Sequence, residues 1–463
     1  MRLTEALLEH AATLQYRDLS AEAVAATRVF VMDSLAVGVS GTGPQLPLAE
    51  VVRDAATALG AGSGARAWVT GERLPATGAA MLNGYLVHGQ EFDCVHMPAV
   101  VHPMAVILPA LVAAAEERAN QGLPPVDGRT LITAVNVAVD VATLLGISAR
   151  APMRFFRPAM CGALGAAAGI ARLHGADADT LHRTVALAYC QLPGTMQAHV
   201  EGSPALAIQV ALASRAAVTA WELAHRGFPP PMDVLEGRFG YLPLYEGEHD
   251  TGPALAALAA REPQLLQVSH KVFPTGGAAH AGQDMLMELR DREGLRMDDI
   301  ESIALQAPPL VHRLVAREWK AAMEPSYARL CLPYLLATVM LDGRVGLDAY
   351  GTDRLADPER AAFAARVRVV PNGSSDPNAL APQAMMVTTR DGRTLRASRD
   401  AVIGSPASPL TRAQQLDKFN HCLDHAARPF DGQRRQALLA TLDRLEALAD
   451  VRDLVDMLII EPT

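Results

Sequence analysis

Ionisable side chains gather in one short part of this chain, between Asn83 and Arg118. Residues 88–102 contain His88, Glu91, Asp93, Cys94, His96 and His102. A long apolar segment with the pattern of a helix begins directly after His102. Titratable groups at the mouth of a buried helix are costly to desolvate, and such groups concentrate at functional sites. The simpler alternative is a solvated loop whose histidines cap helix ends.

The residue types in this stretch suit proton transfer. Histidine titrates near neutral pH, so His102 is a candidate acid or base. Glu91 and Asp93 could orient His102 or His96, or they could only cap a helix. The histidine spacings match no familiar zinc signature, so no metal is expected. Cys94 is more typical of a small buried hydrophobe than of a nucleophile, because no pairing with a histidine is evident.

Composition limits the function classes. Half of the residues are hydrophobic and the net charge is −9, which argues against nucleic acid or an anionic membrane as a partner. The five cysteines are scattered without paired spacing, as is typical of a reducing compartment. The amino terminus lacks the pattern of a signal peptide, and the apolar run Pro103–Ala115 is shorter than the roughly 20 residues that span a bilayer. We expect a soluble, cytoplasmic protein.

Most of the chain has helical periodicity. Long helices are predicted over Asp127–Ile147, Cys161–His174 and Ala205–Arg226. The second of these is so rich in glycine and alanine that another helix must cross it closely.

The pattern changes near His270 and again near Gly404. Glu301–Ala307 and Ala365–Pro371 alternate as strands do, and Met385–Ser398 predicts a hairpin that turns at Asp391-Gly392. The sequence therefore predicts a mainly α protein with a smaller α+β domain. The expected division is a helical part over 1–268, an α+β domain over 269–404, and a return to the helical domain over 405–463.

Several motifs together resemble the MmgE/PrpD family over nearly the whole length. They are Asn83-Gly84 with His88, Phe92, Asp93 and His102-Pro103; the Gly162–Gly175 helix; Arg226-Gly227-Phe228 with Leu235-Glu236-Gly237; Lys271 through Pro274 with His280; Pro333-Tyr334 with Leu341-Asp342-Gly343; and Gly404-Ser405-Pro406 with Lys418-Phe419.

The resemblance implies a large all-helical domain built from both chain ends, with the α+β domain inserted. It also implies a homodimer without metal or organic cofactor, and an active site in the cleft between the domains. Members of this family include 2-methylcitrate dehydratases, cis-aconitate decarboxylases and iminodisuccinate epimerases, which act on small polycarboxylates.

The family's site residues map onto this chain only in part. His102 falls on the histidine of the family's His-Pro motif, and Lys271 falls on a lysine that would bind a substrate carboxylate. Arg157 stands where the family has a histidine; it cannot act as a base, but it could clamp a carboxylate with two hydrogen bonds. His312 replaces a tyrosine and could supply acid or base capacity. His96 and His280 are further candidates for substrate binding.

Other departures remove groups from the site. Leu206 stands in place of a family lysine, Gly276 in place of a histidine, and Val95 in place of a threonine. We therefore expect a reorganised site that still handles a carboxylate.

The sequence favours a cofactor-independent lyase that eliminates water next to a carboxylate, as a 2-methylcitrate dehydratase does. In this hypothesis His102 and His312 move protons, Glu91 and Asp93 orient the histidines, and Lys271 and Arg157 hold carboxylates. Decarboxylation stays open. The alternatives are an epimerase, which removes and returns one proton, and a carboxylate-binding homologue that has lost catalysis, which Leu206 and Gly276 suggest.

Overall fold

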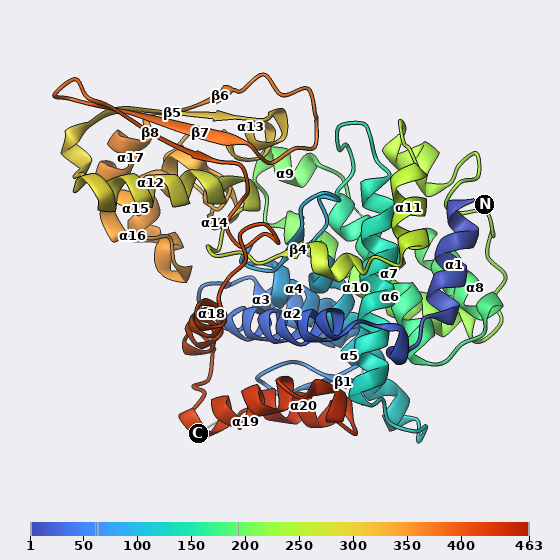
Figure 1. Ribbon diagram of the computed structural model, residues 1–463. Helices are drawn as coiled ribbons and strands as arrows, with labels where there is room; N and C mark the ends of the chain where they lie inside the picture. Colours follow the sequence, from blue (N-terminus) through green and yellow to red (C-terminus); the bar gives the residue numbers. More distant parts are fainter. Residues whose placement is uncertain (1, 61, 63, 193, 462–463) are drawn as a thin grey trace.

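The computed structural model describes residues 2–60, 62, 64–192 and 194–461. A large helical domain forms most of the molecule (Figure 1). Its helices are α1 Leu3–Thr13, α2 Ala21–Ser40, α3 Ala49–Thr57, α4 Ala76–His88, α5 Pro103–Asn120, α6 Gly128–Ile147, α7 Arg157–Leu173, α8 Ala178–Tyr189, α9 Gln197–Glu201, α10 Ala205–Ala224 and α11 Gly252–Ala260. Its short strands are β1 Ala65–Arg66, β2 Arg73–Leu74, β3 Val95–His96 and β4 Val268–Ser269.

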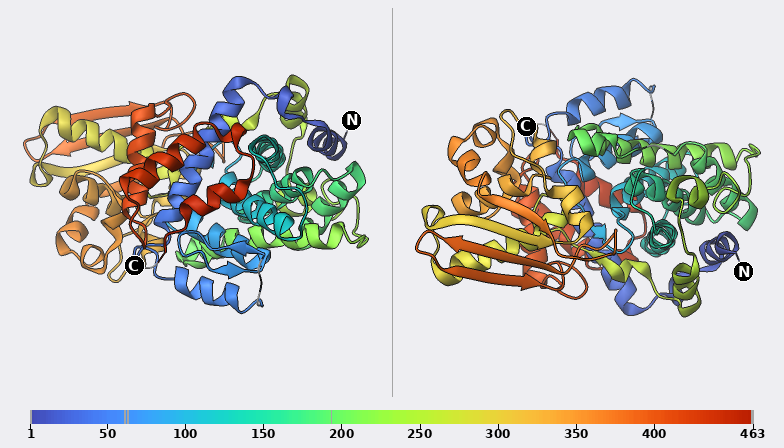
Figure 2. Two further views of the ribbon diagram at one scale, coloured as in Figure 1. Left: turned by 90° about the horizontal axis from the view of Figure 1, so that it is seen from below. Right: turned by 90° about the horizontal axis from the view of Figure 1, so that it is seen from above.

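The second domain is an α+β lobe. It contains α12 His280–Glu293, β5 Ile300–Ala307, α13 Pro309–Val315, α14 Pro325–Ala328, α15 Leu332–Asp342, α16 Thr352–Leu355, α17 Pro358–Ala364, β6 Val367–Pro371, β7 Gln383–Thr389 and β8 Thr394–Arg399. The sheet has the strand order β6-β5-β7-β8, in which only the β5 and β6 pair is parallel. Helices α12 and α15 lie on one face of the sheet, and the view from above in Figure 2 looks onto the other face.

The carboxyl-terminal segment returns to the helical domain, as the sequence predicted. Its helices are α18 Arg412–Asp424, α19 Gly432–Leu442 and α20 Val451–Leu458, and α18 packs along α2 from the other end of the chain (Figure 1). Where the chain enters and leaves the α+β lobe, the two connections lie side by side, because the His270 N–H donates to the Gly404 carbonyl at 2.9 Å. The predicted fold class, mainly α with an inserted smaller α+β domain, is confirmed. The predicted boundary after 268 falls within β4, and the one after 404 falls between β8 and α18.

The glycine-rich helix α7 is crossed closely by its neighbours, as predicted. A Cβ atom on Gly165 would lie 2.3 Å from the Ala138 carbonyl oxygen of α6, and one on Gly162 would lie 2.6 Å from the Val106 side chain of α5. Small side chains thus let three buried helices approach one another, and the core forms around them.

Helices α2 and α6 are long and apolar enough to cross a membrane by length and composition. The apolar windows of these helices are 78% and 89% buried inside the molecule. A helix that is apolar on all sides is equally suited to the core of a large protein.

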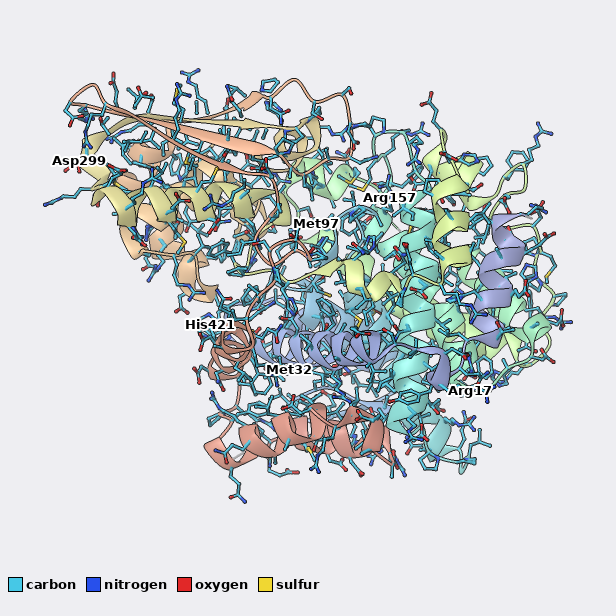
Figure 3. The ribbon with its side chains drawn as sticks, viewed as in Figure 1. Arg17, Met32, Met97, Arg157, Asp299 and His421 are labelled. Atoms are coloured by element: carbon cyan, nitrogen blue, oxygen red, sulfur yellow. The ribbon has the colours of Figure 1, made fainter. Side chains whose placement is uncertain are left out.

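Arg157 is one of the residues that the sequence predicted for the site, and Figure 3 shows where it lies relative to the two domains. Arg157 and Met97 are labelled in the central region, whereas Asp299 marks the far end of the α+β lobe. Strands β3 and β4 pair in this central region, with Val95 opposite Ser269 and His96 opposite Val268. This short antiparallel pair brings the loop before α5 against the segment that carries Lys271.

Candidate active site

The loop between α4 and α5 carries the candidate site. His88 is the last residue of α4, and His102 is the N-cap residue of α5. The proline at the first position of α5 suits a helix start and keeps His102 out of the helical conformation. The negative end of the α4 dipole and the positive end of the α5 dipole therefore meet here. The first favours a cationic imidazole at His88, and the second favours a neutral imidazole at His102.

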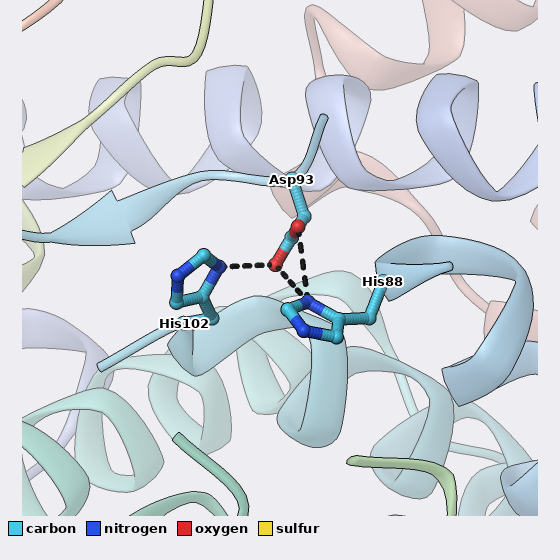
Figure 4. A group of neighbouring side chains, drawn as sticks. All are labelled: His88, Asp93 and His102. Atoms are coloured by element: carbon cyan, nitrogen blue, oxygen red, sulfur yellow. Dashed lines mark hydrogen bonds and ion pairs between the residues drawn. The ribbon is translucent and has the colours of Figure 1, made fainter. Parts of the chain in front are cut away.

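Asp93 joins the two histidines (Figure 4). His102 Nδ1 donates to Asp93 Oδ2 at 2.9 Å, and His88 Nδ1 lies 3.1 Å from the same oxygen and 3.2 Å from Oδ1. The two imidazole rings meet edge to face with their centroids 5.0 Å apart. Because both Nδ1 atoms face the carboxylate, each Nε2 atom is left to act elsewhere.

Lys271 and Glu91 complete the group. The Lys271 ammonium donates to Glu91 Oε2 at 2.7 Å and to the Glu91 carbonyl at 3.1 Å, and it lies 3.8 Å from Asp93 Oδ1. Lys271 and Asp93 are fully buried, whereas the side chains of His102 and Glu91 are each 13% exposed. Two carboxylates, one ammonium and a protonated His88 would make the group electrically neutral.

The environment separates the pKa values of the two histidines. Burial lowers the pKa of His88, but the nearby Asp93 and Glu91 carboxylates outweigh it, so that this pKa is raised above 6.5. Burial and the Lys271 charge together lower the pKa of His102 below 6.5, despite Asp93. A pair of titratable groups driven apart in this way can serve as an acid and a base at the same pH.

The loop itself is held in an unusual conformation. Glu91 and Val100 both have positive φ angles, of 54° and 53°. Such angles are uncommon for residues other than glycine and unfavourable for β-branched valine, and the strain they store is often found at functional sites. From α18, the buried Lys418 ammonium donates to the Phe92 carbonyl at 2.8 Å and pairs with Asp33 of α2 at 2.7 Å. Both ends of the chain therefore fix the loop that presents Asp93.

A pocket of about 180 Å³ adjoins the group, with His88, Glu91, Tyr85, Leu206 and Arg329 in its wall. This volume is several times the roughly 30 Å³ that a water molecule occupies in the liquid, so it suits a small molecule. Arg329, which comes from the segment after α14, is 2% exposed. In the described part of the chain, its Nε and Nη2 atoms have no hydrogen-bond partner.

Comparison with known proteins agrees with this architecture. Residues 5–254 match the MmgE/PrpD N-terminal domain, and residues 273–444 match the MmgE/PrpD C-terminal domain. The chain belongs to the MmgE/PrpD family. The cis-aconitate decarboxylase of Mus musculus is 25% identical over 443 residues, covering 92% of this chain and 87% of that protein. The human cis-aconitate decarboxylase is 26% identical, covering 83% and 80%. The Aspergillus terreus cis-aconitate decarboxylase is 22% identical, covering 98% and 96%.

The structure brings together four of the residues predicted for the site of this MmgE/PrpD chain: Glu91, Asp93, His102 and Lys271. Lys271 is paired with protein carboxylates in this arrangement. In this geometry Lys271 balances the charge of the two carboxylates and lowers the pKa of His102. It is not free to bind a substrate carboxylate.

Arg157 requires a correction. It is buried and forms a two-pronged ion pair with Glu246, with Nε–Oε1 at 3.0 Å and Nη2–Oε2 at 2.9 Å, and its Nη1 donates to the Ala99 carbonyl. The Tyr241 hydroxyl donates to the same Glu246 carboxylate. This guanidinium is therefore held by the protein's own carboxylate, and its role is structural rather than that of a substrate clamp.

Three histidines predicted for the site lie outside the group. His312 is exposed on α13 and lines a different surface hollow, which Trp319 also lines. His96 is buried in β3, where Nδ1 accepts from the Ala99 N–H at 3.1 Å and holds a turn. His280 is fully buried at the start of α12 against the Phe273 ring. The structure thus does not bring His312, predicted for catalysis, or His96 and His280, predicted for substrate binding, into the group around Asp93.

Sequence reasoning gave no role to two residues that the structure places at the pocket, His88 and Arg329. His88 is one of the ionisable residues between positions 88 and 102, and its position five residues before Asp93 could have indicated a contact between the two side chains. Arg329 had none, since it is distant in sequence and no motif marked it. At Gly276, where the family has a histidine, an added Cβ atom would lie 2.4 Å from the end of the Leu330 side chain, which would have to move.

One potential ligand atom each from His88, Asp93 and His102 lies within 4.8 Å of the other two, close enough to hold a metal ion. The same Nδ1 and carboxylate atoms already bond to each other, and the Lys271 ammonium lies 3.8 Å from Asp93. A dication would have to break those hydrogen bonds and sit beside a fixed positive charge. This donor set therefore fits proton transfer better than metal binding.

Proposed function

We propose that this protein is a lyase that acts on a small carboxylate and eliminates water next to the carboxylate group. The observation that carries the proposal is the shared Asp93, which bonds to a histidine of lowered pKa on one side and to one of raised pKa on the other. Elimination of water needs both a base and an acid, and this pair would supply them without any other group.

The proposed step begins at His102. Its neutral Nε2 takes the proton from the carbon next to the carboxylate, while Asp93 holds Nδ1–H and stabilises the imidazolium that forms. The electron pair of the C–H bond becomes the new C=C bond, and the C–O bond at the neighbouring carbon breaks. The departing hydroxide takes the Nε2 proton of His88 and leaves as water.

His88 is suited to the acid role by its position. Its Nε2 atom is buried and has no hydrogen-bond partner among the described residues, and the residue lies in the pocket wall. A leaving hydroxyl group would supply the missing acceptor. His102 gains a positive charge in this step while His88 loses one, so the total charge of the group stays constant. The step therefore separates little charge in a buried site.

Decarboxylation is the second candidate, because the three curated relatives named above are all cis-aconitate decarboxylases. In that reaction a C–C bond to a carboxylate breaks, carbon dioxide leaves, and His88 would protonate the carbon that keeps the electron pair. This route needs the acid more than the base. It therefore predicts a smaller dependence on His102 than elimination does.

Proton NMR in heavy water would separate these reactions. The purified protein would be incubated with 2-methylcitrate, citrate, cis-aconitate and iminodisuccinate, and each product would be identified. An alkene formed from a hydroxy acid supports elimination. Carbon dioxide release from cis-aconitate moves the assignment to a decarboxylase, and hydrogen exchange without net loss moves it to an epimerase. Tight binding of an acid with neither exchange nor turnover would contradict the enzyme assignment altogether.

A further inference from the structure

Arg329 is an unusual residue for a protein interior. Its side chain is buried, yet among the described residues no carboxylate forms an ion pair with it, and its guanidinium lies over the ring of Tyr350, 4.5 Å from the centroid. A buried charge without a hydrogen-bonded partner is destabilising, so arginines are rarely left in this state. The other buried cations nearby are satisfied: Lys271 by Glu91, Arg157 by Glu246 and Lys418 by Asp33.

The place of Arg329 indicates what is missing. It lines the same pocket as His88 and Glu91, and the hydroxyl-bearing residues Ser203 and Ser326 line that pocket as well. Glu91 is already engaged by Lys271 at 2.7 Å. A guanidinium can bind a carboxylate through two parallel hydrogen bonds, and the two buried nitrogen atoms without a partner among the described residues, Nε and Nη2, form an edge that such a contact uses.

Part of the pocket lining is apolar. Leu46, Leu206 and Ala207 line it, and Leu206 is 8% exposed. A second free carboxylate lying against these side chains would lose its hydration without gaining a partner. A methyl or methylene group would instead be favoured by about 0.8 kcal/mol for each CH₂ buried.

We infer that Arg329 is the carboxylate-binding residue of this site and that the substrate is a small acid with an apolar substituent beside the carboxylate held there. The inference rests on the proposed function, because it places the substrate against His88. It extends that function by naming the binding residue and by disfavouring a substrate with three free carboxylates.

Calorimetric binding of two non-reacting acids tests this inference without requiring turnover. The wild-type protein should bind 2-methylsuccinate at least tenfold more tightly than tricarballylate. Arg329→Met should lose measurable binding of 2-methylsuccinate, and Arg329→Lys should bind it weakly. Arg226→Met, which removes an exposed arginine at the end of α10, should bind as the wild type does. Leu206→Lys should reverse the preference toward tricarballylate.

Thermal melting of the ligand-free variants separates binding from a structural role. If Arg329 is held for a ligand, removing its unpaired charge should leave the melting temperature unchanged or raise it. A large fall in melting temperature would assign Arg329 to the fold and overturn the inference. Unchanged binding of 2-methylsuccinate by Arg329→Met, or a wild-type preference for tricarballylate, would also overturn it. If binding behaves as expected but no acid is turned over, only the proposed function fails.

Discussion

At the scale of single residues, the central feature is one buried carboxylate shared by two histidines. Asp93 has a pKa well below 3.8, because His88, His102 and Lys271 together outweigh the effect of burial. It therefore stays ionised and bonds to both Nδ1 atoms. The two histidines differ in pKa because their other neighbours differ. Glu91 lies near His88, with 3.7 Å between His88 Nε2 and Glu91 Oε1, whereas the Lys271 charge lowers the pKa of His102.

These opposite shifts predict a bell-shaped pH dependence of kcat/KM. His102 must be neutral to act as a base, so activity should rise with pH through a value below 6.5. His88 must be protonated to act as an acid, so activity should fall with pH through a value above 6.5. Initial rates measured between pH 4.5 and pH 9, with the substrate found by NMR, would define both limbs.

His88→Gln provides the control for that profile. It should lower kcat by about 10²-fold to 10⁴-fold, the range typical of a lost general acid, and it should remove the alkaline limb while the acidic limb remains. An unchanged alkaline limb in this variant would show that another group is the acid.

The buried Arg157 and Glu246 pair gives a prediction of a different kind. Arg157→Met should reduce the free energy of unfolding by about 3–5 kcal/mol, because it leaves the Glu246 charge buried and unpaired. The double variant Arg157→Met/Glu246→Leu should recover most of that loss. Urea unfolding would measure both. If the single variant is stable but fails to bind substrate, Arg157 is a ligand after all.

At the scale of elements, the sequence predicted the long helices and the sheet well but not the contacts that build the site. Periodicity located α6, α7 and α10, and the Asp391-Gly392 turn located β7 and β8, because these signals are local. Strands β3 and β4 are two residues each and more than 170 positions apart, so no local pattern marks their pairing. That pairing is what brings Lys271 to Glu91. The exposure of His312 likewise depends on how α13 packs against β6, which a resemblance between motifs does not reveal.

The link between α18 and the active-site loop is testable through Lys418. Lys418→Met breaks a buried pair with Asp33 and frees the Phe92 carbonyl next to Asp93, so it should lower stability by about 3–5 kcal/mol and reduce kcat. Lys418→Met/Asp33→Leu should regain stability, as judged by urea unfolding, but not full activity. Full activity in the double variant would mean that α18 does not position the loop.

At the scale of the whole molecule, the inserted α+β lobe and the returning tail explain why distant segments meet at one site. His88, Glu91, Asp93 and His102 come from the first quarter of the chain, Lys271 from the crossing between domains, Arg329 from the lobe and Lys418 from the tail. The fold class followed from composition and motif order. The site could be predicted only where its residues are neighbours in sequence.

The large buried interior also predicts acid sensitivity. Burial lowers the pKa of His96, His199 and His270 to about 4, and of His174 and His280 to about 3. Below about pH 6.5 the unfolded chain binds protons at these positions and the folded chain does not. Their contribution to stability is therefore fully present above pH 6.5 and is lost toward pH 4, at about 1.4 kcal/mol per pH unit for each histidine.

Urea unfolding at several pH values would check this dependence. His270→Gln should flatten the slope between pH 6.5 and pH 4 by about 1.4 kcal/mol per pH unit, the contribution of one histidine. Equal slopes in His270→Gln and the wild type would contradict the assignment of a buried neutral imidazole.

The most direct test of the central claim is the single-turnover rate of His102→Gln with the acid that the wild type converts. Elimination with His102 as the base predicts a fall of about 10²-fold to 10⁴-fold, together with unchanged binding of 2-methylsuccinate and an unchanged melting temperature. In heavy water the variant should also stop exchanging the substrate proton next to the carboxylate. A rate within a few fold of the wild type, with exchange intact, would show that His102 is not the base.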